Sequence, residues 1–138
     1  MLVRRWAGKG ARRMSLRSNE ADIAAVTDVV RTYYDGMMAG DEAKLARAFN
    51  PRACIVGNEQ GKLSWSTLHE FMAECKGAVA QAGPYEWRVE GISFKGDTAL
   101  VRLDGQFAGV WYSDDLSMLL IDDDWRIVHK TFYPHPGS

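Results

Sequence analysis

Two strand-like runs near the end of the chain, residues 111–121 and 125–133, constrain the fold more than any other feature. Both runs are rich in β-branched and aromatic residues, and an acidic turn at residues 122–124 joins them. Because three consecutive carboxylates favour water over a protein interior, the pattern predicts an antiparallel hairpin with an exposed tip. The C-terminal part of the chain is therefore expected to form a sheet.

The first of these runs has two mixed faces. Side chains alternate across a strand, so Trp111, Asp115 and Ser117 share one face, while Asp114 and Met118 share the other. Neither face is uniformly apolar or uniformly polar. We expect one face to line a pocket covered by helices and the outer face to pack on a second copy of the protein, which gives a homodimer.

Composition restricts the class of protein. A length of 138 residues with 46% apolar and 25% charged residues suits one globular domain. The sequence contains no run of about 18 apolar residues, which argues against a membrane span. Cys54 and Cys75 fit neither a disulfide framework nor a metal cluster. We therefore expect no metal and a reducing, cytoplasmic compartment.

Charge is distributed unevenly along the chain. Residues 1–18 hold six of the 17 basic residues and no acid, so the other 120 residues carry 11 basic and 18 acidic side chains, a formal charge of -7. An acidic domain argues against nucleic-acid binding. We expect residues 1–18 to be a disordered basic leader and residues 19–138 to be a single domain. An organelle transit segment, a nucleic-acid or membrane arm, and a start-site artefact with Met14 as the natural start are the alternatives.

Three helices are predicted in the first part of the chain. Apolar residues at helical spacing indicate a helix over residues 20–39 that stops at Gly40. Asp41 is placed to cap a second helix that runs through Phe49. Ser66-Thr67 and Glu70 offer the chemistry of a capping box and predict the start of a third helix, which runs to a break at residues 83–84.

Strands are predicted between and after these helices. Residues 53–56 and 61–63 are short strand candidates on either side of a turn. A longer strand follows Pro84, and its apolar positions change register after Gly91, which predicts a bulge there. Residues 98–107 show the clearest alternation of apolar and polar side chains in the chain.

Short motifs along residues 20–133 resemble those of a known superfamily. The residues that carry the resemblance are Tyr34-Asp35-Gly36, Gly40-Asp41, Phe49-Asn50-Pro51, Gly61-Lys62-Leu63, Gly96-Asp97 with Ala99, Leu116 with Leu119, and Asp124-Trp125-Arg126-Ile127 with Lys130. The chain resembles the nuclear transport factor 2-like (cystatin-like α+β) superfamily, in particular its putative lumazine-binding and SnoaL-like group. The resemblance implies a cone-shaped α+β fold, with three helices on a strongly bent, mostly antiparallel sheet.

The same superfamily includes cofactor-free enzymes such as ketosteroid isomerase and scytalone dehydratase. By that resemblance, an Asp, His or Tyr inside a largely apolar cone would carry the chemistry, because a dry pocket raises the pKa of a carboxylate and strengthens its hydrogen bonds. No phosphate-binding, zinc or serine-hydrolase motif is present in the sequence. No cofactor is therefore expected.

Three residues are candidates for catalysis. Asp115 shares its face with Trp111 and would be a base in an apolar wall, and the adjacent Asp114 must point the opposite way. Tyr34 would donate a hydrogen bond to a substrate, and His129 would transfer a proton near neutral pH. A backbone-bonded Asp115, a core Tyr34 and a hydrogen-bonded sheet histidine are the structural alternatives.

Six residues are candidates for ligand binding. They are Tyr34, Trp65, Phe71, Trp111, Ser117 and Lys130. Trp65, just ahead of the third helix, would close the mouth of the pocket, and Lys130 would pair with an acid across the sheet, with Asp114 as the obvious partner. An ion pair fits Lys130 better than a Schiff-base role. Aromatic residues at such spacings also occur in ordinary cores.

Three functions are compatible with these residues. The domain could bind a small apolar or aromatic ring compound, catalyse proton transfer on one as an isomerase, dehydratase, cyclase or hydrolase, or act as a protein-interaction module. The aromatic and polar residues expected at the pocket favour the first two. No linked acid and base stand out in the sequence, and the preferred interpretation is therefore binding.

Overall fold

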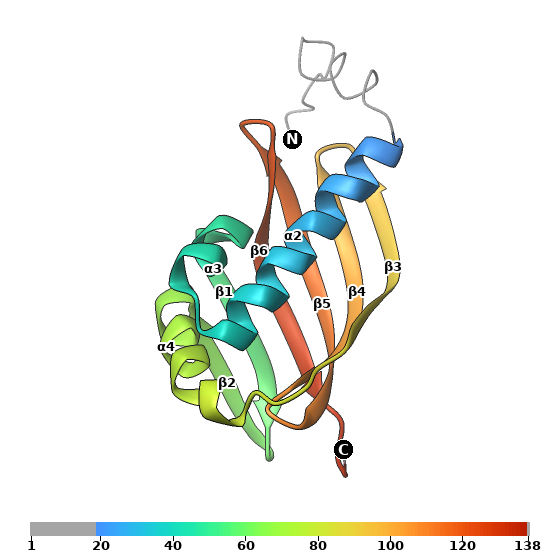
Figure 1. Cartoon of the computed structure of the whole chain (residues 1–138). Helices are drawn as coiled ribbons and strands as arrows, with labels where there is room; N and C mark the ends of the chain where they lie inside the picture. The colour runs from blue at the N-terminus through green and yellow to red at the C-terminus, as the bar shows by residue number, and fades with distance from the viewer. Residues whose placement is uncertain (1–18, 138) are drawn as a thin grey trace, which may run out of the picture.

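The computed structural model describes residues 19–137. The predictions for the basic leader, residues 1–18, lie outside the described residues. The described chain forms three α-helices and a short 3-10 helix on one face of a six-stranded sheet, which is the predicted α+β arrangement (Figure 1). No helix within residues 19–137 is long and apolar enough to cross a membrane.

The helices begin and end close to the predicted positions. Helix α2 spans Asn19–Ala39, and Gly40 follows it with φ +62°, a backbone conformation that favours glycine. Helix α3 spans Glu42–Ala48, and its N-cap Asp41 accepts a hydrogen bond from the backbone N–H of Lys44. Helix α4 spans Leu68–Ala78 with the predicted capping box, and the 3-10 helix η1, Val79–Gln81, continues it.

The strands occur in the order β2-β1-β6-β5-β4-β3 across the sheet. Their bounds are β1 Phe49–Glu59, β2 Lys62–Thr67, β3 Trp87–Lys95, β4 Thr98–Phe107, β5 Val110–Ile121 and β6 Asp124–Pro134. Only the β1–β6 pair is parallel. The first two strands are longer than predicted, because β1 begins directly at the end of α3 and β2 runs up to the start of α4.

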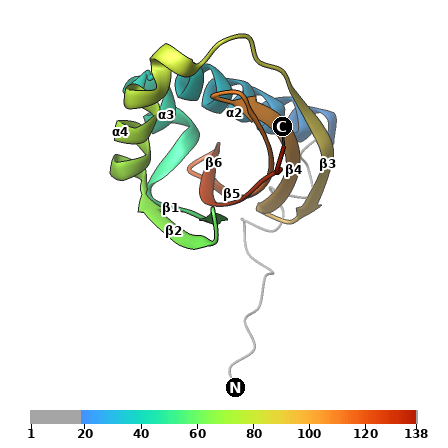
Figure 2. The ribbon, with the colours of Figure 1, turned by 90° about the horizontal axis from the view of Figure 1, so that it is seen from below.

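The sheet is strongly bent and does not close into a barrel (Figure 2). Two β-bulges, on β3 and on β6, accompany this bend, and the β1–β6 pair also shifts register between Phe49 and Cys54. One lies between Val89 and Gly91 on β3, as predicted, and the other lies on β6, where Ser117 pairs with His129 but Met118 pairs with Ile127. The second bulge was not predicted. It determines which residues of β6 face the helices.

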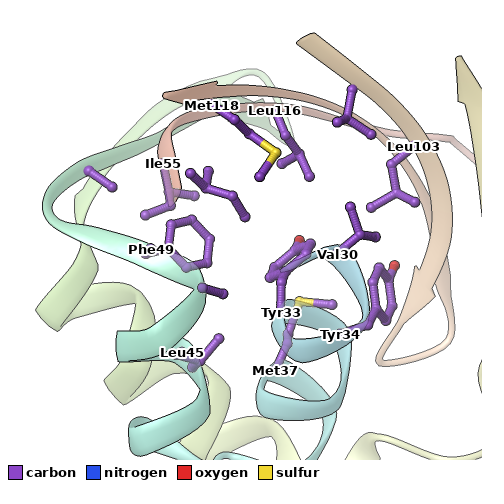
Figure 3. Close-up of a cluster of buried hydrophobic side chains, with 14 of the residues drawn as sticks. Val30, Tyr33, Tyr34, Met37, Leu45, Phe49, Ile55, Leu103, Leu116 and Met118 are labelled. Atoms are coloured by element: carbon purple, nitrogen blue, oxygen red, sulfur yellow. The ribbon is translucent and has the colours of Figure 1, made fainter. Parts of the chain in front are cut away.

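The core fills the space between α2 and the concave face of the sheet. Tyr33, Tyr34 and Met37 project from α2 toward Leu103 and Leu116 on the strands (Figure 3). All five side chains are buried. The larger side chains of α2 lie against the concave face of the sheet. The core and the pocket described below therefore share α2 as a wall.

Candidate functional site

A pocket opens between α2, α4 and the concave face of the sheet. Its empty volume is about 440 Å³, a figure that includes the solvent at its mouth. Six aromatic side chains form much of its wall, namely Tyr33, Tyr34, Phe71, Phe107, Tyr112 and Phe132. The exposed residues Glu59 and Glu74 mark the end that is open to solvent. A concave site with an aromatic lining of this kind is typical of pockets that bind small ring compounds.

Three polar side chains meet in the wall of this pocket. Lys130 Nζ donates a hydrogen bond to Tyr33 Oη at 2.6 Å, and Tyr33 Oη donates one to Asp114 Oδ2 at 2.9 Å. Lys130 Nζ also lies 3.8 Å from Asp114 Oδ2. All three residues are buried and line the pocket. This polar triad, Lys130, Tyr33 and Asp114, is the principal ionisable group of the site.

The electrostatics of the triad follow from burial. Desolvation raises the pKa of Asp114, while the positive charge of Lys130 and the hydrogen bond from Tyr33 lower it and only partly offset burial. Burial, followed by the negative charge of Asp114, raises the pKa of Tyr33 well above its ordinary value. Tyr33 therefore stays protonated and bridges the cation and the carboxylate.

Aromatic rings surround the ammonium group of Lys130. Its Nζ lies 4.6 Å from the ring centroid of Phe71, 5.0 Å from that of Tyr33 and 5.7 Å from that of Phe132. Ring faces carry negative charge density and attract a desolvated cation. These contacts hold the Lys130 side chain in one position. The predicted ion pair between Lys130 and Asp114 is confirmed.

Tyr34 lies beside the triad and lines the pocket, as expected of a ligand-binding residue. Its ring stacks on those of Tyr85 and Trp87, with a centroid distance of 5.9 Å to each. Its hydroxyl occupies the space above Gly105, where any Cβ would overlap it. A glycine at this point of β4 therefore lets Tyr34 reach into the sheet.

The prediction that Asp115 lines the pocket is wrong. On β5 the inward residues include Asp114, Leu116 and Met118, and all three are buried. Asp115 is exposed on the outer face, opposite Arg102 of β4. The hydrophobic effect decides the orientation of the strand, because the alternation that buries Leu116 and Met118 brings Asp114 inside with them.

The prediction for His129 is also wrong in its placement. Regular alternation along the strand would place His129 on the face of Ile127, but the bulge on β6 shifts the alternation, so that Ile127 and Lys130 both point inward. His129 is half-buried and lies outside the pocket lining, 3.4 Å from Thr131 Oγ1 through its Nδ1 atom. A histidine on that face cannot reach a ligand under the helices.

The six predicted ligand-binding residues divide into two groups. Tyr34, Phe71 and Lys130 line the pocket. Trp65 is 63% exposed on β2 and does not close the mouth, because β2 continues past it and its side chain points away from the helices. Trp111 and Ser117 occupy outward positions on β5, on the same face as Asp115, and neither lines the pocket.

Two site residues were missed in the sequence. Asp114 was considered only as a partner for Lys130, and Tyr33 was not among the candidate residues. The spacing of Val26, Val30, Tyr33 and Met37 is typical of a buried helix face and could have identified Tyr33. Within residues 19–137, no group of three metal-ligating side chains could hold an ion.

Comparison with known proteins is consistent with this geometry. The family described as Putative lumazine-binding matches residues 21–133. An NTF-2 like protein of unknown function from Silicibacter pomeroyi DSS-3 is 33% identical, with a TM-score of 0.82 over 86% of this chain and all of that chain. A ketosteroid isomerase-like protein from Erwinia carotovora atroseptica shares the fold at 12% identity, with a TM-score of 0.64 over 85% of this chain and 98% of that one.

A curated relative is more distant. The protein named Aldolase FrzH, from Cladobotryum sp, is 26% identical over 126 residues, which cover 88% of this chain and 96% of that protein. That name applies to the Cladobotryum protein. Together with the family match, these similarities agree with the fold predicted from the sequence.

Proposed function

Since the chain belongs to the putative lumazine-binding family within the nuclear transport factor 2-like superfamily, we propose that it binds a small, flat ring compound in the pocket between α2, α4 and the sheet. The observation that carries the proposal is the buried polar triad within an aromatic pocket. Aromatic walls would hold a ring, and the triad would orient it through a few fixed hydrogen bonds.

The triad supports recognition of a ligand more than it supports stability. A buried ion pair costs desolvation energy that its attraction often fails to offset, and apolar residues of similar volume are commonly as stable or more stable. Lys130 and Asp114 lie in the wall of an otherwise mostly apolar pocket. A binding role accounts for retaining both charges at that point.

Blocking the pocket mouth tests the proposal. Ser64 lines the pocket from β2, whereas its neighbour Leu63 is 68% exposed and not part of the lining. With lumazine as the first probe, followed by fluorescence titration, Ser64→Trp is expected to weaken binding at least about tenfold, because the indole would occupy the mouth. Leu63→Trp, the matched control, is expected to bind as the wild type does. Equal affinities for the two variants would contradict binding in this pocket.

A second candidate function is cofactor-free acid–base catalysis on such a ring, as an isomerase, dehydratase, cyclase or hydrolase. It is favoured by the raised pKa of Asp114, which brings a carboxylate closer to the range of a general base. Asp114, and not Asp115 or His129, would then be the base, with Tyr34 beside it. If the wild type turns over a ring substrate and Asp114→Asn turns it over equally fast, Asp114 is not the base.

We also propose a homodimer formed through the outer face of the sheet. The helices cover the concave face, whereas large apolar side chains remain exposed on the other, including Trp65 and Tyr133. Burying them against a second copy would remove an apolar patch from water. Sedimentation velocity at micromolar concentration is expected to give a dimer, and Trp65→Ser with Tyr133→Ser is expected to shift it toward monomer. A wild type that stays monomeric at every concentration would contradict this.

A further inference from the structure

We propose that the ligand is an uncharged planar ring that presents a hydrogen-bond donor and a neighbouring carbonyl acceptor on one edge, as a cyclic amide does. The donor would bind Asp114, and the carbonyl would bind Lys130. This inference rests on the proposed binding function and specifies its ligand class. It follows from the unused hydrogen-bonding capacity of the triad and from the charges along the pocket.

Within the described part of the chain, one carboxylate oxygen of Asp114 lacks a hydrogen-bond partner. Its Oδ2 atom accepts the hydrogen bond from Tyr33, but Oδ1 has no protein partner, the only such buried side-chain N or O atom within residues 19–137. Asp114 is 3% exposed and lines the pocket. An unsatisfied buried carboxylate oxygen is costly, and a donor on the ligand would remove that cost.

The protonation state of Asp114 decides whether its free oxygen accepts or donates a hydrogen bond. Lys130 donates to the oxygen of Tyr33, and the Tyr33 hydroxyl donates in turn to Oδ2. The donors therefore point along the triad toward the carboxylate, and the ammonium charge lies 3.8 Å from it. Both features offset part of the increase in pKa that burial causes, and they favour the ionised carboxylate, which accepts hydrogen bonds and donates none. A ligand group beside Oδ1 of the ionised carboxylate would be a donor.

Lys130 can donate hydrogen bonds to a ligand as well as to Tyr33. An ammonium group carries three N–H donors, and within the described chain one of them bonds to Tyr33. Lys130 also lines the pocket. A carbonyl oxygen of the ligand would accept a remaining N–H while the neighbouring ring N–H bonds to Asp114. One donor and one acceptor side by side on the ligand thus match one acceptor and one donor on the protein.

The charged side chains along the pocket disfavour an anionic ligand. Lys130 and Asp114 offset each other inside the pocket, and the two ionisable residues at its open end, Glu59 and Glu74, are both acids. An anionic ligand would have to pass these carboxylates and would meet an ammonium group whose charge Asp114 already neutralises. The pocket therefore selects against anions and in favour of uncharged rings.

Two matched pairs of ligands test the inference on the wild-type protein by isothermal titration calorimetry. Quinolin-2(1H)-one and coumarin have nearly the same shape, but coumarin replaces the ring N–H by oxygen. We expect the quinolinone to bind about 10- to 100-fold more tightly, the range for a hydrogen bond to a charged group. Naphthalene-2-carboxamide is likewise expected to bind more tightly than naphthalene-2-carboxylate.

The outcomes separate this inference from the proposed function. Equal binding within either pair would overturn the inference and leave small-ring binding intact, whereas no binding of any of the four compounds would contradict both. Asp114→Asn, which retains the shape of the side chain but removes its charge, is expected to lose the preference for quinolinone over coumarin. A folded Asp114→Asn protein with the wild-type preference would also overturn the inference.

Discussion

Replacing Lys130 by methionine is expected to lower the free energy of unfolding by about 3–5 kcal/mol at pH 7, the usual cost of leaving one member of a buried ion pair without its partner. Lys130 and Asp114 are 6% and 3% exposed, respectively. Without the ammonium group, the negative charge of Asp114 keeps the hydrogen bond from Tyr33 but loses its neighbouring cation. Urea unfolding measures the loss.

The pH dependence of this loss has a defined sign. Burial already raises the pKa of Asp114 in the folded protein, and removing Lys130, whose charge lowers that pKa, raises it further. The penalty is then present above the folded-state pKa, decreases as the pH falls through it, and disappears below the unfolded value of about 3.9. The difference between Lys130→Met and wild type is therefore expected to be smaller at pH 4 than at pH 7.

Two further variants serve as controls for the ion pair. Lys130→Met combined with Asp114→Leu removes both charges, so its stability is expected to return to the wild-type value or exceed it. Lys62→Met, at an exposed position, is expected to change stability by no more than about 0.5 kcal/mol. A Lys130→Met protein no less stable than Lys62→Met would show that the pair is not desolvated.

Replacing Phe49 by alanine is expected to cost about 3–5 kcal/mol, because it leaves a cavity in a fully buried site. Phe49 is the first residue of β1, and its ring lies edge-on to Tyr33 at 5.4 Å and to Phe71 at 5.9 Å. Both neighbours line the pocket. Ligand affinity is therefore expected to fall along with stability, since two pocket walls lose their support.

Phe49→Leu is the matched control, since it keeps most of the apolar volume and is expected to lose less than Phe49→Ala. Thermal and urea unfolding give the stabilities, and calorimetry with a ring compound gives the affinities. A cost below about 1.5 kcal/mol for Phe49→Ala would mean that the core around Tyr33 and Phe71 is less tightly packed than the ring contacts imply.

Much of the fold could be predicted from local sequence signals. The capping box at Thr67 and Glu70, the N-cap at Asp41 and the bulge near Gly91 all depend on residues close together in the chain. Such signals do not require knowledge of the tertiary structure. The ion pair between Lys130 and Asp114 was also predicted, because charge complementarity between adjacent strands limits the possible partners.

The candidate site was harder to predict, because it depends on which face of each strand is buried. Asp114 and Asp115 are adjacent, and an error of one residue moves the carboxylate from the pocket to the outer surface. On β6 the bulge shifts the inward–outward alternation of side chains by one residue between Ile127 and Lys130. No glycine or proline in the sequence marks this bulge. Only the pairing with β5 establishes that His129 faces outward.

Tertiary contacts also determine the polar triad. Tyr33 lies on the first helix, more than 80 residues from Asp114 and more than 95 from Lys130, so no local pattern connects it to them. Its spacing on α2 indicates burial but gives no hydroxyl partner. Figure 1 shows α2 lying across the sheet, and its packing there brings Tyr33 within hydrogen-bond distance of Asp114 on β5 and Lys130 on β6.

A methyl-detected NMR titration tests the central claim, that the pocket binds a small ring compound, most directly. Met37 and Ile55 line the pocket, whereas Met118 is buried in the core outside the lining and Val56 lies on the outer sheet face. With quinolin-2(1H)-one, we expect saturable shifts for the methyl groups of Met37 and Ile55, with much smaller changes at Met118 and Val56. Saturable shifts confined to Val56 and the outer face, or no shifts at millimolar ligand, would contradict the account.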